Sequence, residues 1–157
     1  MKLLNAVPFR PPILPDFLVP YITWTGNCQP NDSEMIALHI SLNAFADEFQ
    51  QQPDGCRPVR VSLILLNSPD VIIQLENNAD CGKFARMILY PIYLWREKHL
   101  SQFAMCISIL EELCHLFYCE DDEKRVQVLV LRCLRHIWPA VRSEDAYNPH
   151  WMPDDSR

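Results

Sequence analysis

Glycine is scarce in this sequence, with 3 residues among 157, whereas proline occurs 13 times. Loops that wrap phosphate groups need several glycines close together, so P-loop and Rossmann-type nucleotide sites are excluded. Basic residues are also few, because 14 Lys and Arg stand against 20 Asp and Glu and give a net charge of −6. An acidic chain without a basic stripe binds nucleic acid poorly, so we expect no nucleic-acid partner.

Long hydrophobic runs are lacking as well. No stretch reaches the roughly 18 consecutive apolar residues of a membrane span, so we expect no membrane partner. The apolar start of the chain is interrupted at Pro8, too early for a signal-peptide core of about 7–15 residues. We therefore expect a cytoplasmic protein.

The cysteines do not form a recognisable framework. There are seven, an odd number, and no two of them have the C-x-x-C spacing of zinc ribbons or redox motifs. Cys106, Cys114 and Cys133 lie in apolar helical runs, where a reduced cysteine behaves as a small hydrophobic residue. We expect reduced thiols and no disulfide framework, which agrees with a cytoplasmic location.

Composition and proline spacing divide the chain into three parts. Hydrophobic residues make up 49% and charged residues 22%, enough for one packed domain. Five prolines between Pro8 and Pro20 predict a proline-rich extended arm over residues 1–30 that wraps the domain or docks on a partner. A single α+β domain is expected over 31–140, followed by a loose C-terminal tail over 141–157.

Hydrophobic periodicity predicts helices and strands within the domain. An amphipathic helix is expected over about 33–51 and a last, nearly all-apolar helix over about 122–137, capped by Asp121 or Asp122. The β-branched runs 59–66 and 71–76 read as two antiparallel strands. Residues 84–96 fit either a third strand or a short helix, and a helical pattern runs from about Glu97 to Tyr118. The expected fold is a small, mostly antiparallel sheet packed against three or more helices.

One helix carries an unusual polar stripe. The run from Phe103 to Phe117 is apolar except at positions spaced i, i+3, i+4 and i+7, which lie on one helix face: Ser108, Glu111, Glu112 and His115. Buried carboxylates must be paired, protonated or metal-bound, so such a stripe indicates either a site or a solvent-exposed surface.

The spacing of this stripe suits a metal ion. Glu112 and His115 are three residues apart, as in the Glu-x-x-His element of helical di-metal sites, but the sequence has no second copy of that element. Further ligands would have to come from elsewhere, and the candidates are Glu120, Asp121, Asp122, Glu123, His39, His99 and His136. For two of these a structural role competes: His39 lies on the apolar side of the first helix, as a core histidine does, and His136 lies near a helix end, where a cation is favourable.

The five residues from Glu111 to His115, EELCH, resemble the His-Glu-x-x-His helix of zincin metallopeptidases with the first His replaced by Glu. The resemblance implies a minimal zincin-like α+β fold. It also implies that Glu111 and His115 bind a metal and that Glu112 is the general base. The third ligand would be Asp121, six residues beyond His115, or else Asp122 or Glu123.

Two functions follow from these patterns. The first is a zincin-like domain, either a metal-dependent peptidase that holds zinc or another divalent metal, or an inactive relative that holds none. Its substrate would add as a strand along an edge of the sheet. The second is a non-catalytic protein-interaction or regulatory domain, such as a phage-type accessory protein, in which residues 1–30 dock a peptide or protein partner.

Overall fold

The computed structural model describes residues 2–51, 58–70, 72–74 and 86–147. Within these residues the main sheet has three strands, β2 (Ile22–Gly26), β3 (Val61–Leu65) and β5 (Met87–Tyr90), in the order β2-β3-β5. Both pairs of neighbours are parallel, so the expected mostly antiparallel sheet is wrong, although the α+β class is confirmed. The physical reason is the connection: β2 reaches β3 through a complete helix, and such a crossover returns the chain in the same direction.

A second, two-stranded ladder lies beside the main sheet. β1 (Lys2–Leu3) pairs antiparallel with β4 (Ile73–Gln74). The predicted antiparallel pairing of the 59–66 and 71–76 strands is therefore wrong, because β3 already has a parallel partner on each side. Residues 71, 75 and 76 of the predicted second strand lie outside the described residues.

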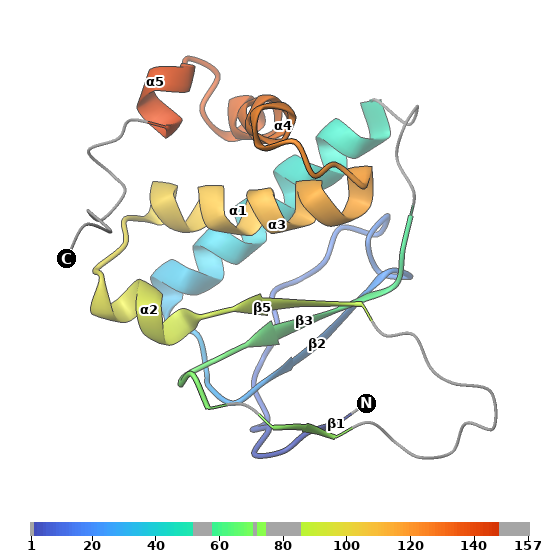
Figure 1. Ribbon diagram of the computed structural model, residues 1–157, viewed down its shortest axis with the longest axis vertical. Helices are drawn as coiled ribbons and strands as arrows, with labels where there is room; N and C mark the ends of the chain where they lie inside the picture. Colours follow the sequence, from blue (N-terminus) through green and yellow to red (C-terminus); the bar gives the residue numbers. More distant parts are fainter. Residues whose placement is uncertain (1, 52–57, 71, 75–85, 148–157) are drawn as a thin grey trace.

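The long helices occur close to where periodicity predicts them: α1 (Asp32–Gln51), α3 (Gln102–Tyr118) and α4 (Glu123–Ile137). In Figure 1, α1 and α3 cover one face of the main sheet, and α4 lies on the side of these two helices away from the sheet. The three helices contact one another. The chain is thus layered as sheet, helix pair and outer helix.

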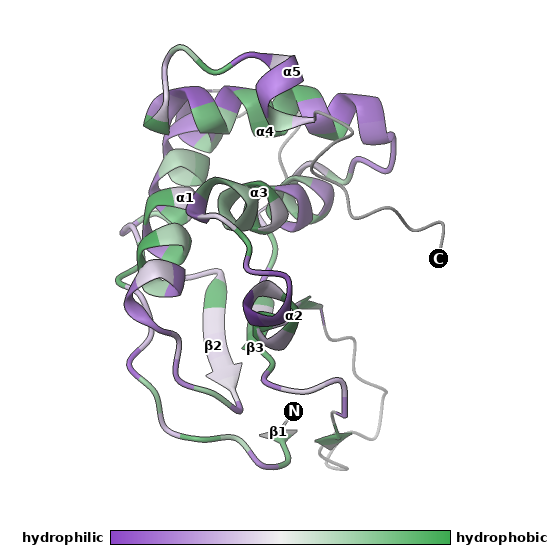
Figure 2. Cartoon of the chain, turned by 90° about the vertical axis from the view of Figure 1, so that its left-hand side faces the viewer, coloured by the Kyte–Doolittle hydropathy of each residue, from purple (hydrophilic) through white to green (hydrophobic). Residues whose placement is uncertain are grey.

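α4, the outermost of these helices, is less apolar than the sequence predicts. The sequence suggests that α4 is apolar nearly all round, but hydrophobic and hydrophilic residues alternate along it in Figure 2. Its buried residues are Val126, Val130, Leu131, Cys133 and Leu134. Val128 is 52% exposed, and Lys124 and Arg125 are exposed too. An outer-layer helix has a partner on one side alone, so its polar residues lie on the other.

The core is packed mainly between the sheet and the helix pair. Phe45 and Phe49 of α1 make ring contacts with Phe117 of α3, with centroids 5.2 and 5.8 Å away. The Tyr90 hydroxyl at the end of β5 donates to the Ile109 carbonyl oxygen of α3 at 3.1 Å, which ties sheet to helix. Among the described residues, Cys106, Cys114 and Cys133 are buried and free, as is Cys28, and Cys119 is free and exposed. Cys56 and Cys81 lie outside the described residues.

The N-terminal segment wraps the domain, as one of the two predictions for it states. Leu18 is completely buried, and Phe9, Leu14 and Phe17 pack against the core. The segment is less irregular than expected, since Ile22–Gly26 forms the edge strand β2. Gly26 lets the strands approach closely there: a Cβ atom at this position would lie 3.0 Å from the Leu65 carbonyl oxygen and 3.3 Å from the Phe9 ring, so its neighbours would have to move slightly.

Residues 84–96 contain both of the elements that the sequence left open. From residue 86 onward the structure places β5 first and then α2 (Ile92–Glu97), with Pro91 between them. The helical pattern that follows is broken at His99, whose φ of 49° is left-handed, and α3 starts only after its N-cap residue Ser101. In the predicted tail, Ser143–Ala146 forms the short helix α5, and residues 148–157 lie outside the described part. Within the described residues, no helix combines the length and apolarity needed to cross a bilayer.

Candidate functional site

The polar stripe lies on α3, and the turn after this helix brings the next helix back to it. Ser101 begins α3 by accepting a hydrogen bond from the Ala104 amide, and Cys119 ends it in the left-handed conformation, with φ 50°. The Glu120 amide then donates to the His115 carbonyl oxygen at 3.2 Å. This tight reversal places residues 120–123 beside the last turn of α3, where the metal hypothesis needs them.

The imidazole of His115 is held by the chain at one ring nitrogen, and the other ring nitrogen faces an acidic side chain. Nδ1 lies 2.7 Å from the Glu120 carbonyl oxygen, and this contact requires Nδ1 to carry the proton and donate. Nε2 lies 3.6 Å from the Glu123 carboxylate. Two of the predicted ligands, His115 and Glu123, are therefore neighbours, and the Glu120 carbonyl oxygen fixes the orientation of the ring between them.

Glu111 stands one turn before His115 and is partly buried. Burial raises the pKa of its carboxyl group, the nearby Tyr147 hydroxyl lowers it, and the Glu123 carboxylate raises it again. The Tyr147 oxygen is buried without a full hydrogen bond, and burial together with Glu111 raises the pKa of that phenol. Glu111, His115 and Glu123 thus share one electrostatic environment between α3 and α4.

The other predicted site residues are used differently. Glu112, the proposed general base, is exposed, as is Asp121. Asp122 is the N-cap of α4, as predicted, and its carboxylate accepts hydrogen bonds from the amides of Lys124 and Arg125 at 2.9 and 3.2 Å. Its oxygen is therefore occupied in starting a helix.

These positions do not fit a three-ligand zinc ion as they stand. Catalytic zinc takes three protein ligands about 2.0–2.2 Å from one point. Within the described ranges, no three His, Cys, Asp or Glu side chains gather so that they could hold one metal ion. The ligand roles of Glu111, His115, Asp121, Asp122 and Glu123, and the role of Glu112 as a base, stay predictions.

Cys114 does not supply an alternative nucleophile. Its thiol is fully buried, and a hydrogen bond with Cys133 together with burial raises its pKa well above the ordinary value. The reactive form of cysteine is the thiolate, so this thiol is held in its inert form.

The most deeply buried carboxylates of the described residues are elsewhere, on α1. Glu34 is 2% exposed and Glu48 is 5% exposed, and the fully buried Ser41 lies midway between them. The amphipathic helix predicted over about 33–51 does not show that these residues are buried. Their spacing of seven places them on one face of the helix, because residues at i, i+7 and i+14 share a face.

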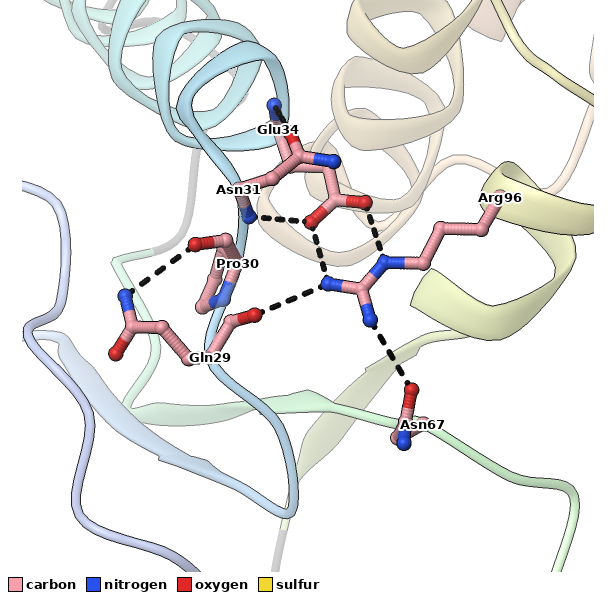
Figure 3. A network of polar contacts seen from close by, with 6 residues as sticks. All are labelled: Gln29, Pro30, Asn31, Glu34, Asn67 and Arg96. Carbon is pink, nitrogen blue, oxygen red and sulfur yellow. Dashed lines mark hydrogen bonds and ion pairs between the residues drawn. The ribbon is translucent and has the colours of Figure 1, made fainter.

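Glu34 is held by an arginine from α2 (Figure 3). Arg96 Nε and Nη2 lie 2.8 and 2.9 Å from the two carboxylate oxygens, a two-point contact. The same guanidinium donates to the Gln29 carbonyl oxygen at 3.0 Å and to the Asn67 side chain at 3.2 Å. The Asn31 amide also donates to Glu34. The network joins the segments that follow β2 and β3 to α1 and α2.

Glu48 is held from α4 at the opposite end of α1. His136 Nε2 lies 3.1 Å from one carboxylate oxygen, and Arg132 Nη1 lies 3.8 Å from the other. His136 lies in the last turn of α4, near the helix end as predicted, and is in addition a partner of a buried acid. His39 is exposed and lies beside Asn43, so the expectation of a core histidine is wrong.

A scan of protein families, a search of curated proteins and a search of solved structures each found no match to this chain.

Proposed function

We propose that this chain is a protein-interaction domain whose zincin-like motif helix has a structural role instead of a catalytic one. The observation that carries the proposal is the hydrogen bonding around the motif helix. His115 Nδ1 donates to the Glu120 carbonyl oxygen, and the Asp122 carboxylate accepts from the Lys124 and Arg125 amides. Both side chains therefore hold the turn that joins α3 to α4.

One further feature supports the same function. The EELCH sequence has Glu111 where zincins have their first histidine, and burial raises the pKa of this carboxyl group, which weakens it as a metal ligand. Because the residues of the motif hold helices together, we assign the function of the domain to its surface.

The test is a measurement of metal binding. The full chain is stripped with a chelator, dialysed against micromolar zinc and analysed by plasma mass spectrometry, with His115→Ala and Glu123→Gln treated alongside. We expect zinc well below one equivalent and the same content in all three proteins. A near-stoichiometric zinc content that is lost in both variants would overturn the proposal and favour the metal-dependent peptidase.

A stability measurement distinguishes the two roles of His115 independently. If the imidazole fastens α3 to α4, His115→Ala lowers the free energy of unfolding in the presence of a chelator, by about 1 kcal/mol for the lost hydrogen bond. A metal ligand without such a role would leave the chelated protein unchanged.

A further inference from the structure

An open hollow lies where the start of α3 meets the segment between α4 and α5. Its volume is about 670 Å³, within the range of about 300–1,000 Å³ that ligand sites occupy. The described residues at its wall include Gln102, Phe103, Trp138 and Val141, together with Glu144 and Asp145 of α5. Figure 1 shows α5 on the same side of the molecule as the N-terminal end of α3.

The floor of this hollow is aromatic, and the backbone that carries Trp138 is hydrogen-bonded. The Phe103 and Trp138 rings meet almost edge to face, with centroids 4.9 Å apart, and both residues remain partly exposed. The Trp138 amide donates to the Leu134 carbonyl oxygen at 2.7 Å, and the Val141 amide donates to the Trp138 carbonyl oxygen at 3.0 Å. Tryptophan is one of the residues that most often dominate the binding energy at protein interfaces.

The rim of the hollow is negatively charged. Glu144 and Asp145 are exposed, and both form ion pairs with the guanidinium of Arg142, at 3.2 and 3.7 Å. Two carboxylates that share one cation leave an excess negative charge, and exposed ion pairs of this kind are weak enough for a second cation to compete. None of the described wall residues is Lys, Arg or His. The net charge of −6 adds a long-range attraction for basic partners.

We propose that this hollow binds a segment of a partner protein in which a large apolar side chain is flanked by Lys or Arg. The apolar side chain packs on Phe103 and Trp138, and the basic group is held between Glu144 and Asp145. This inference rests on the proposed function as a protein-interaction domain and assigns that function to one surface. The same acidic rim repels phosphate-rich surfaces, which excludes anionic membranes and nucleic acid as occupants.

The experiment starts from a random dodecapeptide display selection against the full chain. The most enriched peptide is synthesised with a fluorescent label, and its dissociation constant is measured by anisotropy. We expect enriched peptides to carry a large apolar residue next to Lys or Arg. Enrichment of acidic peptides, or no enrichment over a selection without the protein, would overturn the proposal.

Three variants locate the bound peptide. The double variant Glu144→Gln/Asp145→Asn removes the rim charge, Phe103→Ala removes half of the aromatic floor, and Gln102→Trp fills the hollow without removing a core residue. We expect each to weaken binding about tenfold or more. Glu97→Gln/Asp70→Asn is the matched control, since both side chains are exposed and the change in net charge is the same. The control should bind as the native chain does.

The outcomes separate this inference from the function on which it rests. A peptide that binds equally to the native chain and to all three hollow variants would show that the hollow is not the binding site. The protein-binding function would then lie elsewhere on the surface. Stoichiometric zinc in the metal measurement would overturn the function itself, whatever the peptides do. Gln102→Trp keeps the test valid if Phe103→Ala lowers the stability of the fold, because it adds a side chain at a partly exposed position.

Discussion

The Glu48 carboxylate in α1 lies 3.1 Å from His136 Nε2 in α4, across the contact between the first and last long helices. Glu48 is 5% exposed, so its carboxylate is nearly cut off from water and depends on partners such as His136 within the helical layer. Removing one partner of a buried pair leaves the other uncompensated, which costs more than the pair itself contributes.

His136→Ala should therefore destabilise the fold by about 1–3 kcal/mol, since Glu48 keeps only the more distant Arg132 among its ion-pair partners given above. Glu48→Gln keeps the shape of the side chain and removes its charge, so we expect a smaller loss. Urea denaturation of both variants and of the double variant gives the coupling energy. Strictly additive losses would show that the two side chains do not interact.

Arg96 makes the corresponding contact at the other end of α1. Arg96→Lys keeps the charge but loses the two-point contact with Glu34 and the shared hydrogen bonds to Gln29 and Asn67. We expect a loss of about 1–3 kcal/mol by urea denaturation, because the carboxylate on the other side is buried. Arg135→Lys on the exposed side of α4 is the control and should change stability by less than about 0.5 kcal/mol. Equal losses of stability for Arg96→Lys and Arg135→Lys would mean that the contacts of Arg96 stabilise the fold no more than those of an exposed arginine.

Asp122 and Asp121 are neighbours with different expected roles. Asp122 caps α4 through two backbone amides, so Asp122→Ala should lower the free energy of unfolding by about 0.5–2 kcal/mol. Asp121→Ala is the matched control and should have little effect on thermal or urea unfolding. A larger loss of stability for Asp121→Ala than for Asp122→Ala would contradict the assigned cap and make Asp121 the residue with a role.

The pH dependence of stability should contain a contribution from Glu111. Burial raises its pKa above the ordinary value of 4.5, so the folded state favours the protonated carboxyl group. A raised pKa in the folded state stabilises the fold below pH 4.5, and this contribution is lost as pH rises through the folded-state pKa. Glu111→Gln should therefore gain stability relative to the native chain as pH rises above 4.5.

Denaturation at a series of pH values tests this, and Tyr147→Phe gives a second test. The Tyr147 hydroxyl lowers the pKa of Glu111, so its removal should raise that pKa further and widen the pH range over which stability falls. A constant difference between Glu111→Gln and the native chain at every pH would show that burial does not perturb this carboxyl group.

The helical layer could be predicted from the sequence because its signals are local. Periodic apolar residues define α1 and α3, and the capping residue Asp122 marks the start of α4. The β3 strand followed from its β-branched run. In the candidate site, Glu123 lies near His115 because a short turn after a helix returns the chain to its last residues, and the ligand roles of both stay predictions.

The features that sequence reasoning missed all depend on distant partners. The parallel sheet needs β2, a five-residue strand between two prolines that gave no alternating pattern. Glu34 and Glu48 read as solvent-facing because acids usually are. Their partners Arg96 and His136 lie 62 and 88 residues away in the chain. No local sequence pattern predicts a contact between residues so far apart in the chain.

The parallel order of the main sheet has a consequence for synthesis. β2 leaves the ribosome before α1 and β3, so it has no strand to pair with until the whole of α1 has followed it. The sides of α1 and α3 that contact α4 wait still longer for their cover. A nascent chain that stalls before α4 therefore exposes apolar helix surface, which attracts chaperones and promotes aggregation.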